Sequence, residues 1–150
     1  MEIFDLFASA DREHWMSQLR KCDWGAGRFL CQLIDEDRFR ALTGEWSELL
    51  LLTDGDRLVS FCTFCGMDEI DNTELSPWVG FVYTFPEYRG RRCFGRLLEK
   101  AKSLAAEAGF DAIYISTDHI GLYEKYGFEY IGDLKNRWGD DCRVYRSDVR

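Results

Sequence analysis

One crossover in the middle of the chain restricts the fold more than any other feature. The aromatic and β-branched segment 78–85 predicts a strand, and Pro86 ends it because proline has no N–H to donate to a sheet. Segment 91–108 predicts a helix with an apolar stripe, and Gly109 is a typical residue to follow its last turn. The next strand is predicted at 112–117. This connection places the amino end of a helix beside the carboxyl end of the strand before it.

The segments around this crossover predict a mixed sheet. Helical spacing of apolar residues predicts one helix over 11–22 and a second from about Arg28 to Leu42. Two apolar runs joined by Asp54-Gly55-Asp56 predict a hairpin over 49–65. Towards the carboxyl terminus we expect a short helix and two more strands, at 120–126, 128–133 and 142–148. Hairpins combined with one helical crossover indicate a mixed α/β (α+β) fold, and no linker or repeat divides residues 1–150, so we expect a single domain.

Composition limits the classes of partner. The 150 residues are 46% hydrophobic and carry a net charge of −8, which argues against a nucleic-acid-binding protein and favours cationic or amine-bearing ligands. The amino-terminal segment lacks the basic start and apolar run of a secretory signal, and no apolar stretch is long enough to span a membrane. We therefore expect a cytoplasmic protein without membrane contact, in which the six cysteines are reduced thiols.

The spacing Cys62-x-x-Cys65 could belong to a redox motif or to a zinc site. A redox motif would open a helix, whereas this pair lies in a predicted strand that turns the two thiols to opposite faces. A structural zinc site needs a second pair of ligands, which the sequence does not provide. We interpret both residues as core packing and expect no metal.

Four arginines gather where the helix at 91–108 is predicted to begin. The helix dipole disfavours cations at this end, yet the chain places here Arg89, Arg91, Arg92 and Arg96. A bound polyanion would explain them, since phosphate binds both arginine and the free N–H groups of a helix start. The alternative is a solvated basic patch that balances the acidic surface, and composition does not choose between the two.

Two motifs here resemble those of the GNAT superfamily of N-acetyltransferases. The segment PEYRG at 86–90, followed by a helix that contains Leu97-Leu98, is similar to the family's acyl-CoA-binding motif. The segment STDHIGLYEKYGFEYIG at 116–132 resembles the family's next motif. The resemblance covers about residues 78–132. It implies a GNAT-like fold, with a central, mostly antiparallel twisted sheet of about six to seven strands flanked by about four helices.

The resemblance implies acetyl-CoA as the acyl donor. Its pantetheine arm would pair with main-chain groups near Tyr83, Thr84 and Phe85, and its pyrophosphate would bind the loop composed of Arg89, Gly90, Arg91, Arg92, Cys93, Phe94 and Gly95. The family's loop usually reads Arg/Gln-x-x-Gly-x-Gly/Ala, so Arg92 and Phe94 stand where small residues are usual. We expect the side chains of Arg91 and Arg92 to compensate.

The family's mechanism is a direct attack of an amine on the thioester. By resemblance Tyr123 is the general acid that protonates the leaving thiolate, a role that suits a phenol un-ionised at neutral pH. The alternative is that Tyr123 only packs its ring, as we expect for Tyr126 one turn later.

The general base stays unassigned. The strand 78–85 contains no carboxylate, which excludes a base on that strand. The candidates in the flanking loops are Glu69, Asp71, Asp118 and His119. A solvated loop position is the alternative for Glu69 and Asp71, and a helix cap is the alternative for Asp118.

The acceptor is expected to be a small-molecule or peptide amine. Its pocket would be walled by the first two helices and the last strands, with Trp24, Arg28 and Trp138 as candidates that could equally be structural. The second interpretation of the whole chain is a catalytically silent CoA-binding or regulatory module. In either case we expect a monomer or a homodimer.

Overall fold

A seven-stranded sheet organises the molecule in the computed structural model, which describes residues 1–70 and 72–150. The strand order is β1-β2-β3-β4-β5-β7-β6, and every neighbouring pair is antiparallel except the parallel pair β4–β5. The strands are β1 (Glu2–Asp5), β2 (Glu48–Asp54), β3 (Arg57–Cys65), β4 (Trp78–Thr84), β5 (Ala112–Thr117), β6 (Glu129–Lys135) and β7 (Asp141–Asp148). This arrangement confirms the predicted mixed α/β class with a mostly antiparallel sheet.

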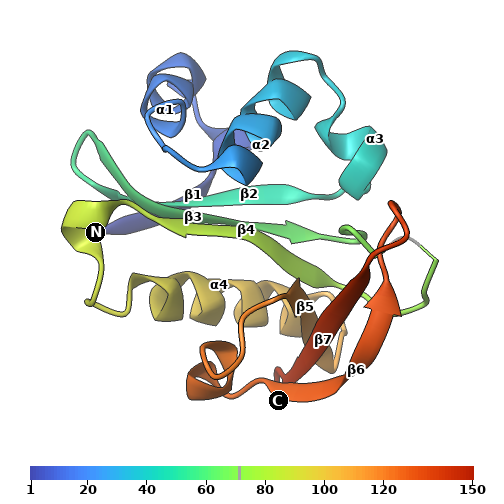
Figure 1. Ribbon diagram of the computed structural model, residues 1–150. Helices are drawn as coiled ribbons and strands as arrows, with labels where there is room; N and C mark the ends of the chain where they lie inside the picture. Colours follow the sequence, from blue (N-terminus) through green and yellow to red (C-terminus); the bar gives the residue numbers. More distant parts are fainter. Residues whose placement is uncertain (71) are drawn as a thin grey trace.

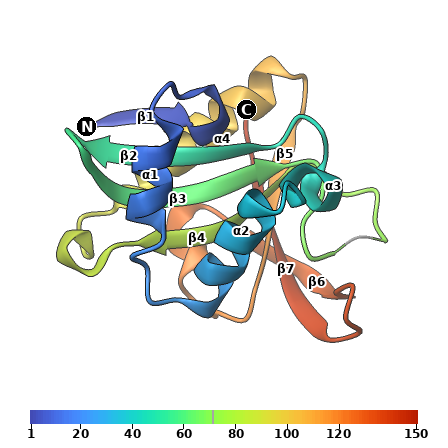
Figure 2. The same cartoon turned by 90° about the horizontal axis from the view of Figure 1, so that it is seen from above.

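Helices cover both faces of this sheet. The α-helices are α1 (Arg12–Leu19), α2 (Gly25–Asp35), α3 (Phe39–Thr43) and α4 (Cys93–Glu107), and short 3-10 turns stand at η1 (Leu6–Ala8), η2 (Pro86–Tyr88) and η3 (Tyr123–Tyr126). Figures 1 and 2 show α1, α2 and α3 on one face of the sheet and α4 on the other. The main hydrophobic core lies between the sheet and these helices. In the part of the chain that is described, no helix has the length and apolar character needed to cross a membrane.

Two local predictions differ from the structure. A single helix from Arg28 to Leu42 is wrong, because Asp37 adopts a left-handed conformation (φ 56°) and the chain separates α2 from α3 there. The N–H of Arg38 closes α2 by donating to the carbonyl oxygen of Leu33 at 2.8 Å. Strand β1 was not predicted, because four residues at an edge give little periodic signal. The Asp-Gly hairpin between β2 and β3 is confirmed, with Gly55 at φ 60°.

The predicted crossover is present and leaves a gap between β4 and β5. The two strands share one register pair, Trp78 with Tyr114, and then diverge towards their carboxyl ends. A bulge interrupts β4 opposite β3, and Phe81 takes a positive φ of 46° there. A bulky residue in this region is unusual and marks functional sites more often than regular strands. The crossover therefore places the start of α4 and the turn η3 on the two sides of one opening.

Candidate active site

A cavity of about 560 Å³ lies where β4 and β5 diverge. Its walls come from β4, from β5 with the loop that follows it, from the loop before β4, from α2 and from the β6–β7 hairpin. The residues used below that line it are Trp24, Asp68, Glu69, Gly80, Phe81, Val82, Asp118, His119, Tyr123, Arg137 and Trp138. The volume and the mixture of aromatic walls with a few polar groups suit a small-molecule site.

The start of α4 presents a row of free donors near this opening. Among the described residues, the backbone N–H groups from Gly90 to Phe94 have no acceptor in the protein, whereas the N–H of Gly95 donates to the carbonyl oxygen of Arg92 at 3.0 Å. Gly90 and Arg92 have positive φ angles of 80° and 54°, which turn the loop into the helix. Free N–H groups together with the positive end of the helix dipole form an anion-binding site.

The four arginines at this end are exposed and have no acidic partner in the described part of the chain. Three of the guanidinium groups lie over tyrosine rings: Arg89 is 5.4 Å from the ring centroid of Tyr83, Arg91 is 5.7 Å from that of Tyr88 and Arg92 is 5.0 Å from that of Tyr126. Stacking orders a guanidinium while leaving N–H groups at its edge for a ligand.

Phe94 departs from the usual small residue without blocking the loop. Its side chain is buried and packs edge-to-face on Tyr123 and Tyr126, with ring centroids 5.6 and 5.0 Å away. Cys93 is also buried and points its thiol towards the carbonyl oxygen of Tyr88. Both side chains thus face the interior, and their backbone N–H groups stay open to an anion.

The predicted pantetheine residues occupy the end of β4. The N–H of Phe85 donates to the carbonyl oxygen of Val59 on β3 at 3.0 Å, so this group is engaged within the sheet. Because main-chain groups alternate along a strand, those of Thr84 point towards the gap. There the Nε of Arg89 donates to the carbonyl oxygen of Thr84 at 2.9 Å. The ring of Tyr83 instead stacks on Trp24, with centroids 5.7 Å apart.

Tyr123 begins η3 and lines the cavity from the β5 side. Its side chain is 6% exposed, and burial raises the pKa of Tyr123 to about 12, so the phenol keeps its proton at neutral pH. Tyr126 packs against Phe94 and under Arg92, consistent with the packing role expected for it.

The structure separates the candidates for the general base. Glu69 is engaged by three donors, since its oxygens accept from Ser116 Oγ at 2.6 Å, from Asn136 Nδ2 at 3.3 Å and from the thiol of Cys142 at 3.4 Å. Asp118 and His119 line the cavity. The expected cap of η3 by Asp118 is absent from the described residues: Leu122 holds the cap position, and the N–H of Gly121 donates to Glu124. Asp71 lies outside the described residues.

Asp68, which no motif in the sequence singles out, lines the cavity immediately beside β4. Burial, aided by the neighbouring Glu69 carboxylate, raises the pKa of Asp68 to about 7. The signal that could have indicated this residue is Gly80, which leaves a space in β4 large enough for a side chain from another segment.

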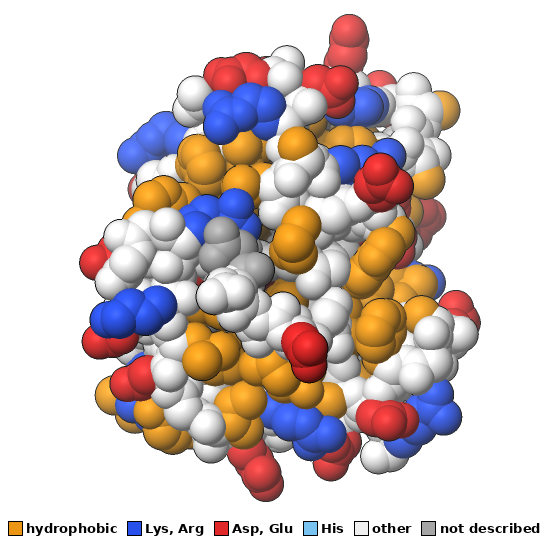
Figure 3. Space-filling model, turned by 90° about the vertical axis from the view of Figure 1, so that its right-hand side faces the viewer, with side chains coloured by type: hydrophobic (Ala, Val, Ile, Leu, Met, Phe, Trp, Pro, Cys, Tyr) orange, Lys and Arg blue, Asp and Glu red, His pale blue; other side chains and the backbone are white. Residues whose placement is uncertain are grey.

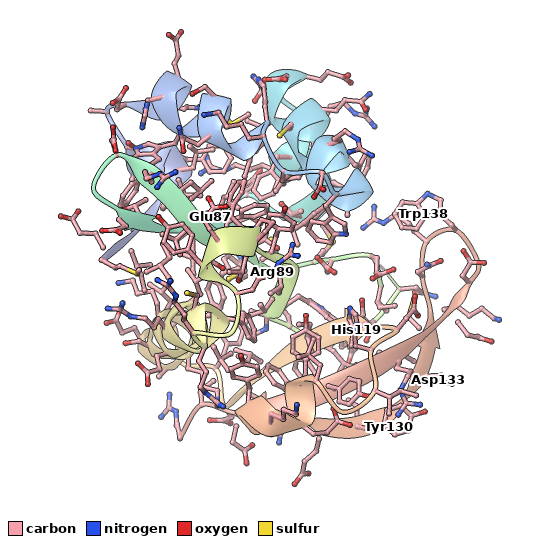
Figure 4. All side chains as sticks on the ribbon, turned by 60° about the vertical axis from the view of Figure 1, so that its left-hand side comes forward. Glu87, Arg89, His119, Tyr130, Asp133 and Trp138 are labelled. Carbon is pink, nitrogen blue, oxygen red and sulfur yellow. The ribbon has the colours of Figure 1, made fainter. Side chains whose placement is uncertain are left out.

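The three acceptor-side candidates have different positions. Trp24 and Trp138 line the cavity, whereas Arg28 is exposed beside a separate depression next to Cys31. Trp138 is 61% exposed near the tip of the β6–β7 hairpin, and Figure 4 shows it extending towards the helical layer. On the face in Figure 3, Lys and Arg are interspersed with Asp and Glu rather than gathered into a basic surface.

The cysteines are core residues. All six are buried free thiols, and burial raises the pKa of Cys65 to about 12 and also raises the pKa of Cys62. A reactive cysteine needs an accessible thiolate. These positions therefore favour the packing interpretation of the Cys62-x-x-Cys65 pair.

Comparisons with known proteins agree with this geometry. Residues 32–131 match the Acetyltransferase (GNAT) domain family. Aminoglycoside 6'-N-acetyltransferase from Enterococcus faecium is similar in structure, with a TM-score of 0.68 and 16% identity over 100% of this chain and 98% of that chain. GNAT family N-acetyltransferase YhbS from Escherichia coli, in complex with CoA, has a TM-score of 0.71 and 20% identity over 99% of this chain and 81% of that chain.

No curated protein matches the sequence significantly. The similar structures share the fold, and the family match spans well over half of the residues. The chain therefore belongs to the GNAT acetyltransferase family.

Proposed function

We propose that the chain is a single-domain cytoplasmic N-acetyltransferase, a monomer or a homodimer, which transfers the acetyl group of acetyl-CoA to an amine in a ternary complex. One observation carries the proposal: the start of α4, with its free backbone donors, packs through Phe94 on Tyr123, which lines the cavity between β4 and β5 together with several carboxylates. Helix donors alone would suit many anions. The adjacent gap adds the space for an extended acyl arm.

Acetyl-CoA would bind with its pyrophosphate at the loop from Arg89 to Gly95. The five free N–H groups and the unpaired arginines support this position. Its pantetheine arm would follow β4 past Thr84, whose main-chain groups face the gap. The bulge at Phe81 would then lie near the thioester.

In the reaction, the nitrogen of a neutral amine forms a bond with the thioester carbon, and the bond from that carbon to sulfur breaks. CoA leaves as a thiolate, to which Tyr123 gives its phenolic proton. The position of Tyr123 in the wall of the cavity supports this role, and the phenol is un-ionised at neutral pH.

The acceptor is proposed to be a small-molecule or peptide amine that carries positive charge. Carboxylates and tryptophans line the same cavity, and Asp68, Asp118 and Trp138 are examples. Two proteins similar in structure are named as aminoglycoside acetyltransferases, which supports the choice of a small cationic amine as the first class to test.

Calorimetric titration with acetyl-CoA, CoA and adenosine tests the donor site. We expect acetyl-CoA and CoA to bind and adenosine not to bind, because only the first two carry both the pyrophosphate and the pantetheine arm. A thiol-release assay with a panel of primary amines then measures turnover. Binding without any turnover would support the alternative, a silent CoA-binding module, and absence of binding would overturn both.

A further inference from the structure

We propose that Asp68 is the group that accepts the proton of the attacking amine. The inference deepens the proposed function and rests on it. Strand β4 contains no carboxylate, yet the carboxylate of Asp68 lies against it. That carboxylate comes from the loop between β3 and β4.

Gly80 provides the space for Asp68. A Cβ atom added at Gly80 would lie 2.5 Å from Oδ1 of Asp68 and 3.1 Å from its Cγ, so any larger residue would displace the carboxylate. The aspartate thus occupies the place that a side chain of β4 would otherwise take. Both residues line the cavity that also contains Tyr123.

The loop is held firmly at this point. Nη2 of Arg137, in the β6–β7 hairpin, donates to the main-chain oxygen of Asp68 at 2.6 Å, and the N–H of Arg137 donates to the carbonyl oxygen of Glu69 at 2.9 Å. The Arg137 guanidinium therefore fixes the Asp68 backbone. Glu69 has its carboxylate engaged by Ser116, Asn136 and Cys142, which leaves Asp68 as the better-placed acceptor of a proton.

The position along β4 also fits the role. The anion site precedes α4, Thr84 ends the strand, and the bulge at Phe81 separates that end from Gly80. Four residues of strand span about 13 Å. An acyl arm that enters past Thr84 would bring its thioester to the bulge, with Asp68 beyond it on the side from which an amine arrives.

The electrostatic surroundings keep Asp68 near the balance between its two protonation states. Burial and Glu69 raise its pKa, while Arg137 and the N–H of Glu69 oppose the increase, and the result is about 7. The other titratable groups near it are the Cys65 thiol on β3 and the groups that line the same cavity, namely Asp118, His119, Tyr123, Asp140 and Asp141. A base poised near neutral pH suits proton transfer from an amine.

The Asp68 carboxylate takes one proton from the ammonium form of the acceptor, which leaves a neutral amine. The nitrogen then forms its bond with the thioester carbon, and the bond from that carbon to sulfur breaks. Tyr123 gives its proton to the thiolate of CoA and regains one from solvent, to which the acylated nitrogen gives its second proton. The products are the acetamide, CoA thiol and protonated Asp68, which returns its proton to solvent.

The test compares the wild type with Asp68→Asn and Glu69→Gln, and uses Asp54→Asn in the exposed hairpin turn as a neutral control. The acceptors are benzylamine, which is protonated at neutral pH, and aniline, which is mostly neutral. We expect Asp68→Asn to lower kcat/KM for benzylamine about 100-fold and to remove the inflection near pH 7, while aniline loses little. Glu69→Gln should keep an inflection but move it to lower pH, because the Glu69 charge helps to raise the pKa of Asp68, and acetyl-CoA affinity should stay unchanged in all variants.

Slow hydrolysis of acetyl-CoA by the protein provides a readout that needs no amine, since water then gives its proton to the same carboxylate. If Asp68→Asn kept full activity in both aminolysis and hydrolysis, the inference would be overturned and the proposed function would stand. Loss of the inflection in Glu69→Gln but not in Asp68→Asn would have the same meaning. If the wild type bound acetyl-CoA but catalysed neither reaction, both the inference and the proposed acetyl transfer would be overturned. A wild type that does not bind acetyl-CoA would overturn the proposed function at its donor site.

Gly80→Ala provides an independent variant with Asp68 intact. The added methyl group displaces the carboxylate, so we expect a fall of about 10-fold in kcat/KM for benzylamine with acetyl-CoA affinity retained. A ¹³C NMR titration of the aspartate carboxyl carbons, with Asp68 assigned from Asp68→Asn, should give a midpoint near 7 in the wild type. A midpoint near the ordinary value of about 4 would contradict the inference.

Discussion

Burial acts on two ionisable side chains in the same cavity, and its consequences for them differ. It raises the pKa of the Tyr123 phenol to about 12 and that of the Asp68 carboxyl to about 7. The phenol stays protonated over the whole physiological range, as an unshifted tyrosine would. The carboxyl group instead titrates within that range and can accept a proton. One desolvated site would therefore hold both the acid and the base of the proposed acetyl transfer.

Tyr123→Phe tests the acid. We expect a fall of about 100-fold in kcat with the dissociation constant of acetyl-CoA unchanged, because the variant removes one proton donor and keeps the ring. Tyr126→Phe is the matched control and should remain near the wild-type rate. Single-turnover thiol release measures the chemical step. A wild-type rate in Tyr123→Phe would assign the acid to another group or to water.

Asp68→Asn also tests the folded-state ionisation of this residue. Because its pKa is raised, the folded protein binds more protons than the unfolded chain between about pH 4 and pH 7, so the free energy of unfolding falls as pH rises through this window. Asn removes this loss, and we expect the variant to be more stable than the wild type by about 4 kcal/mol at pH 8, with little of this gain at pH 4. Urea unfolding at both pH values measures it, and an equal difference at both would contradict the expectation.

At the scale of the element, α4 and the loop before it explain the cluster of arginines. The cations lie at the helix end where the dipole disfavours them, but tyrosine rings order three of them, and free backbone donors surround the same spot. Phe94 points inward and connects α4 to η3. The loop that is proposed to bind the pyrophosphate thus also contacts Tyr123 through one buried aromatic side chain.

The double variant Arg89→Ala/Arg92→Ala tests this element. We expect CoA affinity to fall about 10-fold or more and its dependence on salt concentration to weaken, because two charge-assisted contacts with phosphate are lost. Arg38→Ala/Arg150→Ala is the matched control, because Arg38 lies between α2 and α3 and Arg150 donates to the carbonyl oxygen of Ala106 at the opposite end of α4. Calorimetry at two salt concentrations gives both quantities. Unchanged affinity would mean that the arginines form a solvated patch.

Elements with strong periodicity were predictable from the sequence, and the exceptions have physical causes. The crossover and the hairpins follow from alternation and from turn residues, and they are confirmed. The break at Asp37 depends on one left-handed residue, which apolar spacing does not report. Asp68 could not be identified from the sequence, because its position depends on a contact with Gly80, twelve positions away. Neither the segment around Asp68 nor the segment around Gly80 carries a local pattern that predicts this contact.

At the scale of the molecule, the sheet consists of two parts that are joined by one register pair between neighbouring strands in the described residues. β1 to β4 form the first part and β5, β7 and β6 the second, and the register joins them only through Trp78 and Tyr114 in the described residues. The cavity fills the angle between the parts, and Figure 1 shows β6 and β7 turned away from the main plane. A ligand in this angle contacts both parts and links them.

Acetyl-CoA is therefore expected to stabilise the whole fold. At a concentration of about 100 times its dissociation constant, it should add about 2.7 kcal/mol and raise the melting temperature by about 5 to 10 °C. Differential scanning calorimetry measures the shift, with adenosine as the control. Hydrogen exchange should slow at Thr84 and from Gly90 to Phe94. A shift without protection of these amides would place the ligand elsewhere.

The space at Gly80 has a consequence for how related chains can diverge. With Asp68 of the loop as the proposed proton acceptor, position 80 on β4 needs no acidic side chain, but it must stay small to leave space for the Asp68 carboxylate. Substitutions at positions 68 and 80 are therefore expected to be coupled in evolution. In an alignment of relatives, we expect an acid at position 68 to occur with glycine at position 80. Where position 80 is itself an acid, position 68 should lose its constraint, and independent variation of the two columns would contradict the coupling.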